Sequence, residues 1–487
     1  MSGTVRAASA DRILARWRLR HRDAATDRAA LPDPDRAAGS EGLPEIRHIV
    51  VLMMENHSFD NYLGTLGHGE GLTREADGGW GPANPGPDGA PIRPHHFATT
   101  RQASGDPTQS WHASHIQYAD GRLDGFPRSV VETDPGGDPT TPMGFWTEED
   151  LPFYASLART FALADRWHCS LLGPTFPNRR FLISGTAHGL VDDALIATFD
   201  HPQTGTLFDL LDRHGISWAN YHPVSGPGSL LGRSLRRAGH RTRRAVRLGL
   251  SSALPSMLKM GKSDFQFTVD LYPTGVLREL RHLRSTERFF RDAKDGTLPA
   301  VSIVDPDFQA NSEENPQDIR DGEQYAASVI EAVMHGPGWP HSLLVWLYDE
   351  HGGYFDHVPP PAAVEPDDVQ PRSLLAVSGR WRWLLRRLPA WRRAVMEDSG
   401  GGRYDRLGFR VPAVVVSPYA RPGYVCSTVF DHTAVLKLIE RKWNLPPLTR
   451  RDAAAADLLE LVDLDAAPAF LDPPALAPPG RGRSSPG

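Results

Sequence analysis

The feature that most constrains the fold is an unbroken apolar run, Ile49–Met54, which ends abruptly on Glu55 and Asn56. Continuous apolar runs of this length are typical of strands that are buried on both faces of a parallel sheet. Ligands of such sheets bind just beyond the carboxyl ends of the strands. The oxygen-bearing side chains of Glu55 and Asn56 are therefore predicted to lie in a functional site.

A second apolar run, Ser342–Tyr348, ends in the same way on Asp349 and Glu350. Two such strands can direct their oxygen-bearing side chains to one point, which is the geometry that a divalent cation needs. Hard oxygen donors favour Mg²⁺, Ca²⁺ or Mn²⁺. Zinc stays open, because three histidines lie in related stretches, namely His351, His357 and His432. The plainer alternative, in which each acid caps a helix or pairs with an arginine, is weaker for two matched pairs than for a single acid.

A third candidate piece is the turn at Gly173 and Pro174, which is followed by Thr175 and by a helix predicted from Asn178. This arrangement puts a hydroxyl near a helix N-terminus, where backbone N–H groups and the helix dipole favour an anion. A threonine hydroxyl is a weak nucleophile until a metal or a base activates it. The alternative role for Thr175 is a simple N-cap. Arg179, in the same helix, is predicted either to neutralise a bound anion or to form a structural salt bridge.

Short apolar runs alternate with helical patterns along most of the chain. The predicted strands are 48–54, 160–165, 216–221, 300–304, 342–348 and 411–417. The predicted helices are 178–186, 206–213, 276–293, 321–335 and 431–442. Such alternation is typical of an α/β fold with a mostly parallel central sheet flanked by helices.

Composition argues against several classes of protein. The chain has 487 residues, of which 40% are hydrophobic and 23% charged, so we expect a globular fold. A net charge of -6 gives no reason to expect a nucleic-acid partner, and the two cysteines provide no zinc-binding spacing. No apolar stretch reaches the roughly 18 residues of a membrane span, and no signal-peptide core follows the basic N-terminus. The expected location is cytoplasmic or peripheral to a membrane, with secretion left open.

The stretch 371–396 lacks acidic residues and mixes tryptophan and leucine with arginine. Its three tryptophans are Trp381, Trp383 and Trp391. Basic amphipathic helices of this composition lie in the membrane interface, so the stretch predicts peripheral membrane contact. The alternative is a solvated arginine face whose apolar side packs on the core.

Five segments of the chain resemble signature blocks of one known family. They are HIVVLMMENHSFDNYLG, SWHASHIQYADGRLDGF, GPTFPNRRFLISGT, WLYDEHGGYFDHVPPP and FDHTAVLKLIERKW. The chain resembles the bacterial phosphoesterase family that contains non-specific phospholipases C and the acid phosphatase A type enzymes. The blocks run from about residue 46 to residue 443 in the family's order, and several blocks in order are more specific than any one alone.

The resemblance implies an alkaline-phosphatase-like α/β core and a metal-assisted, covalent phosphoryl transfer. It implies a divalent metal ion bound by the four strand-end residues, Glu55, Asn56, Asp349 and Glu350. Thr175 matches the nucleophile, which is Ser or Thr in the family. Three histidines match family blocks: His115 in the block associated with phosphate or leaving-group contacts, His357 in the DHVPPP block and His432 in the DHT block.

The chain also departs from the family at Gln109 and Asn315, where histidines are common. These departures leave the identity of the general acid open, and His357 is the first choice. The predicted organisation is a flexible basic lead-in over 1–45, a phosphoesterase catalytic domain over 46–466 and a Pro-rich disordered tail over 467–487. Insertions into the catalytic domain are predicted near 225–262 and 371–400.

The resulting expectation is metal-dependent hydrolysis of phosphate esters. Phospholipase C-type cleavage of a phosphodiester, through a phosphothreonine intermediate, is the favoured form, with phospholipid as the candidate substrate. One alternative is an acid phosphomonoesterase that acts on soluble substrates. The other is a catalytically impaired, lipid-associated protein of the same fold.

Overall fold

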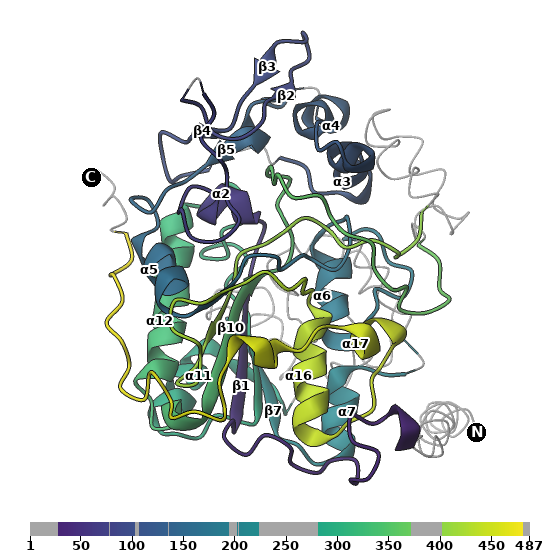
Figure 1. The fold of residues 1–487 in the computed structure, drawn as a ribbon, viewed down its shortest axis with the longest axis vertical. Coiled ribbons are helices and arrows are strands. Elements are labelled where there is room, and N and C mark those ends of the chain that lie inside the picture. Colours follow the sequence, from purple (N-terminus) through teal and green to yellow (C-terminus); the bar gives the residue numbers. More distant parts are fainter. Residues whose placement is uncertain are drawn as a thin grey trace, which may run out of the picture.

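The computed structural model describes residues 28–76, 78–102, 107–134, 136–193, 202, 204–223, 281–371 and 402–480. Within them, an eight-stranded sheet forms the centre of the protein, in the order β12-β6-β11-β10-β1-β9-β7-β8 (Figure 1). Its strands are β1 (His48–Met54), β6 (Ala162–Ala164), β7 (Trp218–His222), β8 (Leu283–Ser285), β9 (Val301–Val304), β10 (Ser342–Tyr348), β11 (Ala413–Val416) and β12 (Val425–Cys426).

Most neighbouring strands in this sheet are parallel. Strands β8, β7, β9, β1 and β10 pair in parallel, and β12 pairs in parallel with β6. Strand β11 runs antiparallel to both of its neighbours, β10 and β6. The predicted α/β fold with a mostly parallel central sheet is therefore confirmed.

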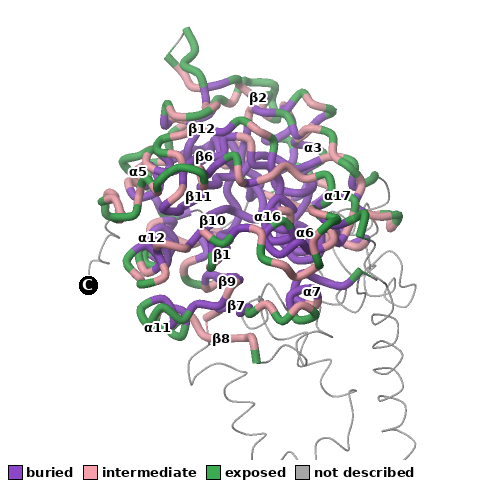
Figure 2. Tube along the Cα trace, turned by 60° about the horizontal axis from the view of Figure 1, so that its bottom comes forward, coloured by how far each residue is buried: buried purple, intermediate pink, exposed green. Residues whose placement is uncertain are grey.

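Helices cover both faces of the sheet (Figures 1 and 2). On one face lie α5 (Pro152–Thr160), α11 (Thr286–Lys294) and α12 (Ile319–Met334), and on the other lie α6 (Thr175–Ser184), α7 (Leu207–Arg213) and α16 (Thr433–Trp443). Figure 2 shows the strands as a buried layer between them. Every residue from Ile49 to Met54 is fully buried. Coverage on both faces explains why this strand is apolar at every position rather than at alternate ones.

The six predicted strands are present, with small differences at their ends, but one predicted helix is partly wrong. Residues Leu283–Ser285, predicted to be helical as part of 276–293, form strand β8 and pair with Asn220–His222 of β7. The helix starts later because the side chain of Ser285 accepts a hydrogen bond from the backbone N–H of Arg288 and so caps α11. Residues 276–280 lie outside the described residues.

Small elements surround the carboxyl edge of the sheet, at the top of Figure 1. They are α2 (Phe59–Leu63), β2 (Asn84–Pro85), β3 (Pro91–Ile92), β4 (His95–His96), α3 (Trp111–Tyr118), α4 (Phe126–Thr133) and β5 (Gly144–Phe145). A second, smaller apolar cluster that includes Phe126, Phe355 and Phe409 holds this region together. The remaining described helices are α17 (Arg450–Ala454) and short 3-10 turns at 28–30, 119–121, 141–143, 339–341 and 458–461.

Parts of the predicted lead-in and of the predicted Pro-rich tail contact the central domain. In the lead-in, the carboxylate of Glu41 pairs with Lys442 at 2.8 Å. In the tail, the carbonyl of Phe470 accepts from the indole of Trp339, and the backbone N–H of Gly480 donates to Glu323 at 2.7 Å. Composition predicts that such segments cannot form a core of their own, but it does not show that they can pack on an existing one.

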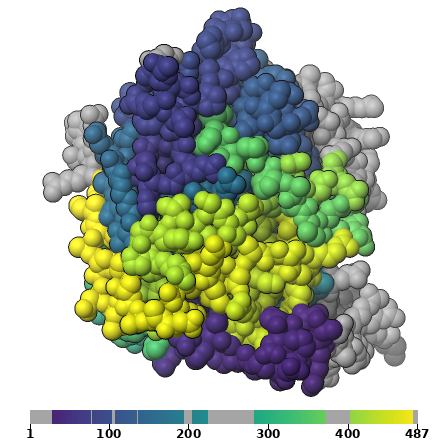
Figure 3. All heavy atoms as spheres, in the orientation of Figure 1, coloured from purple at the N-terminus to yellow at the C-terminus, as the bar shows by residue number. Residues whose placement is uncertain are grey.

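Figure 3 shows residues 402–480 as a broad yellow-green band across the face that is turned to the viewer, with residues of the lead-in beside it at the bottom.

Residues 1–27 and 481–487 lie outside the described part, as do 224–280 and 372–401, which contain nearly all of the two predicted insertions. The membrane contact predicted for 371–396 therefore falls outside the described residues, apart from Pro371. No helix in the described ranges is both long enough and apolar enough to cross a membrane.

Candidate functional site

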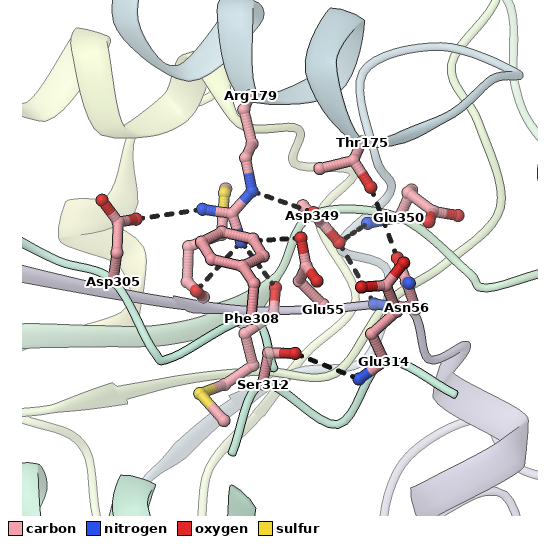
Figure 4. A network of polar contacts seen from close by, with 12 residues as sticks. Glu55, Asn56, Thr175, Arg179, Asp305, Phe308, Ser312, Glu314, Asp349 and Glu350 are labelled. Carbon is pink, nitrogen blue, oxygen red and sulfur yellow. Dashed lines mark hydrogen bonds and ion pairs between the residues drawn. The ribbon is translucent and has the colours of Figure 1, made fainter. Parts of the chain in front are cut away.

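The carboxyl ends of β1 and β10 bring the four predicted metal-binding residues together. Met54 and Tyr348 are paired in the parallel register, so both strands end at the same level. Just beyond them, Asp349 Oδ1 accepts the backbone N–H of Asn56 at 3.2 Å and that of Glu350 at 2.8 Å. Glu55, Asn56, Asp349 and Glu350 are all buried. The structure thus confirms their proximity, and Figure 4 shows them grouped at one end of the sheet.

A close backbone contact fixes the spacing of the two strand ends. Asn56 has a positive φ of 70°, and its carbonyl lies so near Gly352 that a Cβ there would be 1.9 Å from the oxygen. Gly352 also has a positive φ of 67°. A glycine is required at this position both by the backbone conformation and by the lack of space.

Thr175 is the first residue of α6, three residues before the predicted helix start, so it does not act as the N-cap. Pro174 occupies the N-cap position in an extended conformation. The side chain of Asn178 folds the preceding turn back, donating to the carbonyls of Gly173 at 2.9 Å and Pro174 at 3.1 Å. The Oγ1 of Thr175 lies 3.5 Å from the Oδ1 of Asn56. The structure therefore brings the predicted nucleophile to the strand-end residues.

Arg179 lies one helical turn after Thr175 and is almost completely buried. Its Nε donates to Asp349 Oδ2 at 2.9 Å, and its Nη1 donates to Asp305 Oδ1 at 3.0 Å. Its Nη2 donates to the carbonyls of Met53 and Met54 and lies 3.9 Å from Glu55 Oε1. Of the two roles that the sequence left open for Arg179, these contacts match the structural salt bridge.

Two adjacent acidic side chains, Asp349 and Glu350, are buried in the site. Burial raises the pKa of Asp349, and the neighbouring guanidinium of Arg179 opposes that effect. Burial also raises the pKa of Glu350 well above its ordinary value, and the charge of Asp349 raises it further. Glu350 Oε2 accepts the N–H of Gly352 at 2.7 Å, whereas Oε1 is buried and accepts no hydrogen bond from any described residue. A buried carboxylate oxygen without a donor is costly unless a cation balances it.

The donor set fits a hard cation, although the carboxylates alone do not enclose one. No group of three or more His, Cys, Asp or Glu side chains among the described residues is arranged to hold a metal ion. The amide oxygen of Asn56 and the hydroxyl of Thr175 would therefore have to complete the set, together with Glu350 Oε1. All of these donors are oxygens, which favours Mg²⁺, Ca²⁺ or Mn²⁺ over a site built from histidines.

His432 is next to the site but is fully engaged within the protein. Its Nε2 donates to the carbonyl oxygen of Asp349 at 2.7 Å, and its Nδ1 accepts from the indole of Trp167 at 3.3 Å. Burial lowers the pKa of His432 to about 4, so the ring is neutral at physiological pH. His432 therefore positions the strand end that carries Asp349.

His357 is joined to Asp60 and Arg410 rather than to Thr175. Its Nδ1 lies 2.6 Å from Asp60 Oδ2, which also accepts its backbone N–H at 2.7 Å. Burial lowers the pKa of His357, but the hydrogen bond and charge of Asp60 outweigh burial and leave the pKa above its ordinary value. With Nδ1 engaged and the side chain 23% exposed, Nε2 is the nitrogen that remains to exchange a proton.

His115 lies on α3, where its Nδ1 donates to the carbonyl of Trp111 at 2.7 Å. The ring also contacts that of Trp111 in a tilted arrangement, with the ring centroids 4.5 Å apart. Burial lowers the pKa of His115, which favours a neutral ring with Nε2 as an acceptor. Trp111 lies beside the turn at Gly173, since a Cβ on that glycine would be 3.5 Å from its ring. His115 is thus on a helix that packs near the Thr175 turn, without a direct contact to Thr175.

Sequence reasoning missed three acidic residues around the site. Asp305 directly follows β9, which pairs with β1, so the strand-end pattern used for Glu55 could have identified it. Asp193 Oδ1 accepts the backbone N–H of Phe176 at 2.8 Å, and Figure 4 shows the side chain of Glu314 pointing towards Asn56. Neither Asp193 nor Glu314 follows a strand, so no local pattern marks them.

Comparison with known proteins gives consistent matches over most of the chain. A family model described as the phosphoesterase family matches residues 46–446. Phospholipase C B of Mycobacterium tuberculosis is 31% identical over 462 residues, covering 88% of this chain and 79% of the relative. Non-specific phospholipase C6 of Arabidopsis thaliana is 28% identical over 442 residues, covering 86% of this chain and 72% of the relative. Human ectonucleotide pyrophosphatase/phosphodiesterase 5 aligns over 64% of this chain and 94% of its own, with a TM-score of 0.30 and 9% identity.

Proposed function

Because the chain belongs to the phosphoesterase family, we propose that it is a phospholipase C-type phosphodiesterase that reacts through a phosphothreonine at Thr175. The family and the relatives named phospholipase C make it a hydrolase of phosphoester bonds. The observation that carries the finer proposal is the position of Thr175 Oγ1, 3.5 Å from Asn56 Oδ1 and at the start of α6.

The proposed reaction has two steps at this hydroxyl. In the first, Thr175 Oγ1 loses its proton to solvent and forms a bond to phosphorus, while the bond between phosphorus and the leaving alcohol oxygen breaks and the alcohol takes up a proton. In the second, water attacks phosphorus and loses a proton, the bond between phosphorus and Oγ1 breaks, Thr175 regains its hydroxyl proton, and the phosphate monoester is released. A divalent cation held by Glu55, Asn56, Asp349 and Glu350 would lower the pKa of the attacking hydroxyl and stabilise negative charge.

The start of α6 is suited to hold the phosphoryl group. Thr175, at the first helical position, carries the phosphoryl group at the end of α6 where the helix dipole favours negative charge. The first turn itself offers few donors, because Asp193 accepts the N–H of Phe176 and Pro177 has none. Arg179 holds Asp349 and Asp305 from within the protein. We therefore assign the stabilisation of the non-bridging oxygens to the helix start and the cation, and assign Arg179 to positioning.

His357 is the proposed general acid for the leaving alcohol. Among the histidines matched to the family, His115 and His432 have lowered pKa values, whereas His357 has a raised one and is the better proton donor. Asp60 fixes its Nδ1, as the carboxylate does in an Asp–His pair of a hydrolase.

The decisive experiment compares turnover of phosphatidylcholine vesicles and of p-nitrophenyl phosphate by the wild type and by Thr175→Ala. The proposal expects cleavage of the lipid by the wild type, none by Thr175→Ala, and a phosphorylated Thr175 in acid-quenched digests. Turnover of p-nitrophenyl phosphate alone would replace the proposal with a phosphomonoesterase. Failure on both substrates would support the impaired, lipid-associated protein, for which Gln109 and Asn315 are the sequence features.

Membrane contact through 371–396 remains part of this proposal. It is supported by the tryptophan and arginine content of the stretch and by the interfacial substrate. Replacing Trp381, Trp383 and Trp391 with Ser should reduce vesicle binding and lipid turnover while sparing p-nitrophenyl phosphorylcholine, a soluble diester. Unchanged vesicle binding would return the stretch to an ordinary surface role.

A further inference from the structure

Glu313 is a fully buried carboxylate in the loop between β9 and α12, and three tyrosine hydroxyls donate to it. Tyr62 donates to Oε2 at 2.8 Å, Tyr154 to Oε1 at 2.6 Å, and Tyr348 also to Oε2. These tyrosines, which we call the tyrosine clasp, come from α2, α5 and β10. The side chain of Glu313 thus connects helices α2 and α5 with strand β10, which leads directly into Asp349.

The backbone of Glu313 is held as firmly as its side chain. Glu313 has a positive φ of 78°, which is unusual for a residue other than glycine, and such a conformation persists only where the surroundings impose it. Its carbonyl accepts from His57 Nε2 at 3.1 Å and from the amide of Gln102. On α12, Gly322 makes room for the side chain, because a Cβ there would lie 2.1 Å from Glu313 Cγ.

The residues on either side of Glu313 contact the candidate site. The carbonyl of Ser312 accepts the backbone N–H of Glu55 at 3.1 Å. The hydroxyl of Ser312 accepts the backbone N–H of Glu314 at 3.2 Å. Figure 4 shows Ser312 and Glu314 beside the strand end that bears Glu55 and Asn56. Any shift of Glu313 would therefore move the backbone that places Glu55.

A purely structural role does not require a carboxylate at this position. Burying an acid in an apolar region is costly, and a polar network of this kind is often no more stable than well-packed apolar residues. Burial raises the pKa of Glu313 to about 8, although the tyrosine hydroxyls act in the opposite sense. The tyrosine clasp differs from ordinary apolar packing in that its hydrogen bonds fix the position of the Glu313 side chain.

We propose that Glu313 is a positioning residue for hydrolysis, which sets the 312–314 loop through the tyrosine clasp and thereby places Glu55 and Glu314 relative to Thr175. This inference rests on the proposed function of Thr175. It assigns Glu313 no contact with the substrate.

The test compares Glu313→Gln with Glu323→Gln as a matched control. Glu323 is equally buried and lies on α12, but it accepts only backbone N–H groups, from Phe153 at 2.8 Å, Gly480 at 2.7 Å and, at the longer distance of 3.4 Å, Tyr154, and no clasp hydroxyl donates to it. The substrate is p-nitrophenyl phosphorylcholine. For Glu313→Gln we expect kcat to fall about 10- to 100-fold, because a misplacement of about 1 Å can cost that much, with KM nearly unchanged. Glu323→Gln should lower the melting temperature by a similar amount and keep wild-type kcat.

Tyr62→Phe removes one clasp hydroxyl and little else, so it decides the matter if Glu313→Gln does not fold. We expect kcat to fall in Tyr62→Phe as well, but by less than in Glu313→Gln. Wild-type kcat in both folded variants, or an equal loss in Glu323→Gln, would overturn the proposal. Thr175→Ala is measured in parallel: if that variant retains turnover, the proposed nucleophile is wrong, whereas the kcat ratio between the two Gln variants still reports on Glu313.

Discussion

Arg179 Nε donates to Asp349 Oδ2 across 2.9 Å, and this bond joins the helix that begins at Thr175 to the strand end that carries Glu350. The same guanidinium reaches Asp305 at the end of β9. The guanidinium of Arg179 therefore fixes the helix that carries the proposed nucleophile relative to two strand ends that lie on either side of β1.

Removing Arg179 should destabilise the fold strongly. Arg179→Ala would remove the positive charge that is paired with the buried Asp305 and Asp349, and breaking a buried ion pair typically costs about 3–5 kcal/mol of unfolding free energy. Urea denaturation measures the loss. Arg441→Ala is the control, because its pair with Asp457 is largely exposed and is expected to contribute about 0–1 kcal/mol. Equal losses in the two variants would show that the buried network does not hold the site together.

A divalent cation should stabilise the protein through Glu350. Chelation with EDTA should lower the melting temperature, and adding back the fitting ion at about 100 times its Kd should restore about 2.7 kcal/mol. Thermal unfolding across Mg²⁺, Ca²⁺, Mn²⁺ and Zn²⁺ titrations identifies the ion. Glu350→Gln should abolish the shift, whereas Glu440→Gln, which alters a buried acid elsewhere, should retain it. A full shift in Glu350→Gln would remove this residue from the ion site.

His357→Gln should lower kcat most for those substrates whose alcohol is a poor leaving group. Loss of a general acid typically costs about 10²–10⁴-fold in kcat, and the cost is smallest where the leaving group needs no proton. We therefore expect a large loss with phosphatidylcholine dispersed in detergent and a small one with p-nitrophenyl phosphorylcholine. His115→Gln should show no such difference between the substrates. A uniform loss for both substrates in His357→Gln would argue for a structural role in the network with Asp60 and Arg410.

The stability difference between Glu313→Gln and the wild type should depend on pH. Burial raises the pKa of Glu313 from 4.5 to about 8, so between these values the folded protein keeps a proton that the unfolded chain releases. The contribution of this group to stability is therefore complete below pH 4.5 and is lost as pH rises towards 8. Glutamine stays neutral, so the melting temperature of Glu313→Gln relative to the wild type should rise between pH 5.5 and pH 8. A constant difference over that range would mean that Glu313 is ionised throughout.

The sequence predicted the parts of the site that follow local rules. The runs before Glu55 and Asp349 are unbroken, apolar and of strand length, which is the pattern expected of strands covered on both faces of a sheet. The same rule applied to Val301–Val304 would have identified Asp305. The sequence predicts the helix from Asn178, three residues after its observed start at Thr175, because a proline such as Pro177 is typical just where a helix begins, whereas here it occupies the third helical position.

The remaining parts depend on contacts between distant segments, which no local pattern encodes. Arg179 had two acceptable roles until the structure placed it between Asp305 and Asp349. Glu313 gave no signal, because its partners Tyr62, Tyr154 and Tyr348 lie far from it in the sequence. The contacts of Phe470 with Trp339 and of Gly480 with Glu323 join the Pro-rich tail to elements that lie far away in the sequence.

The carboxylate of Asp349 organises the backbone around it before any ligand arrives. Its Oδ1 accepts the N–H groups of Asn56 and Glu350, and its Oδ2 accepts from Arg179. These bonds fix the two turns that carry the neighbouring donors, so little conformational entropy remains to be lost when an ion or a phosphate binds. The site is therefore preorganised, and the affinity for the proposed ion would depend chiefly on charge and desolvation rather than on ordering of the chain.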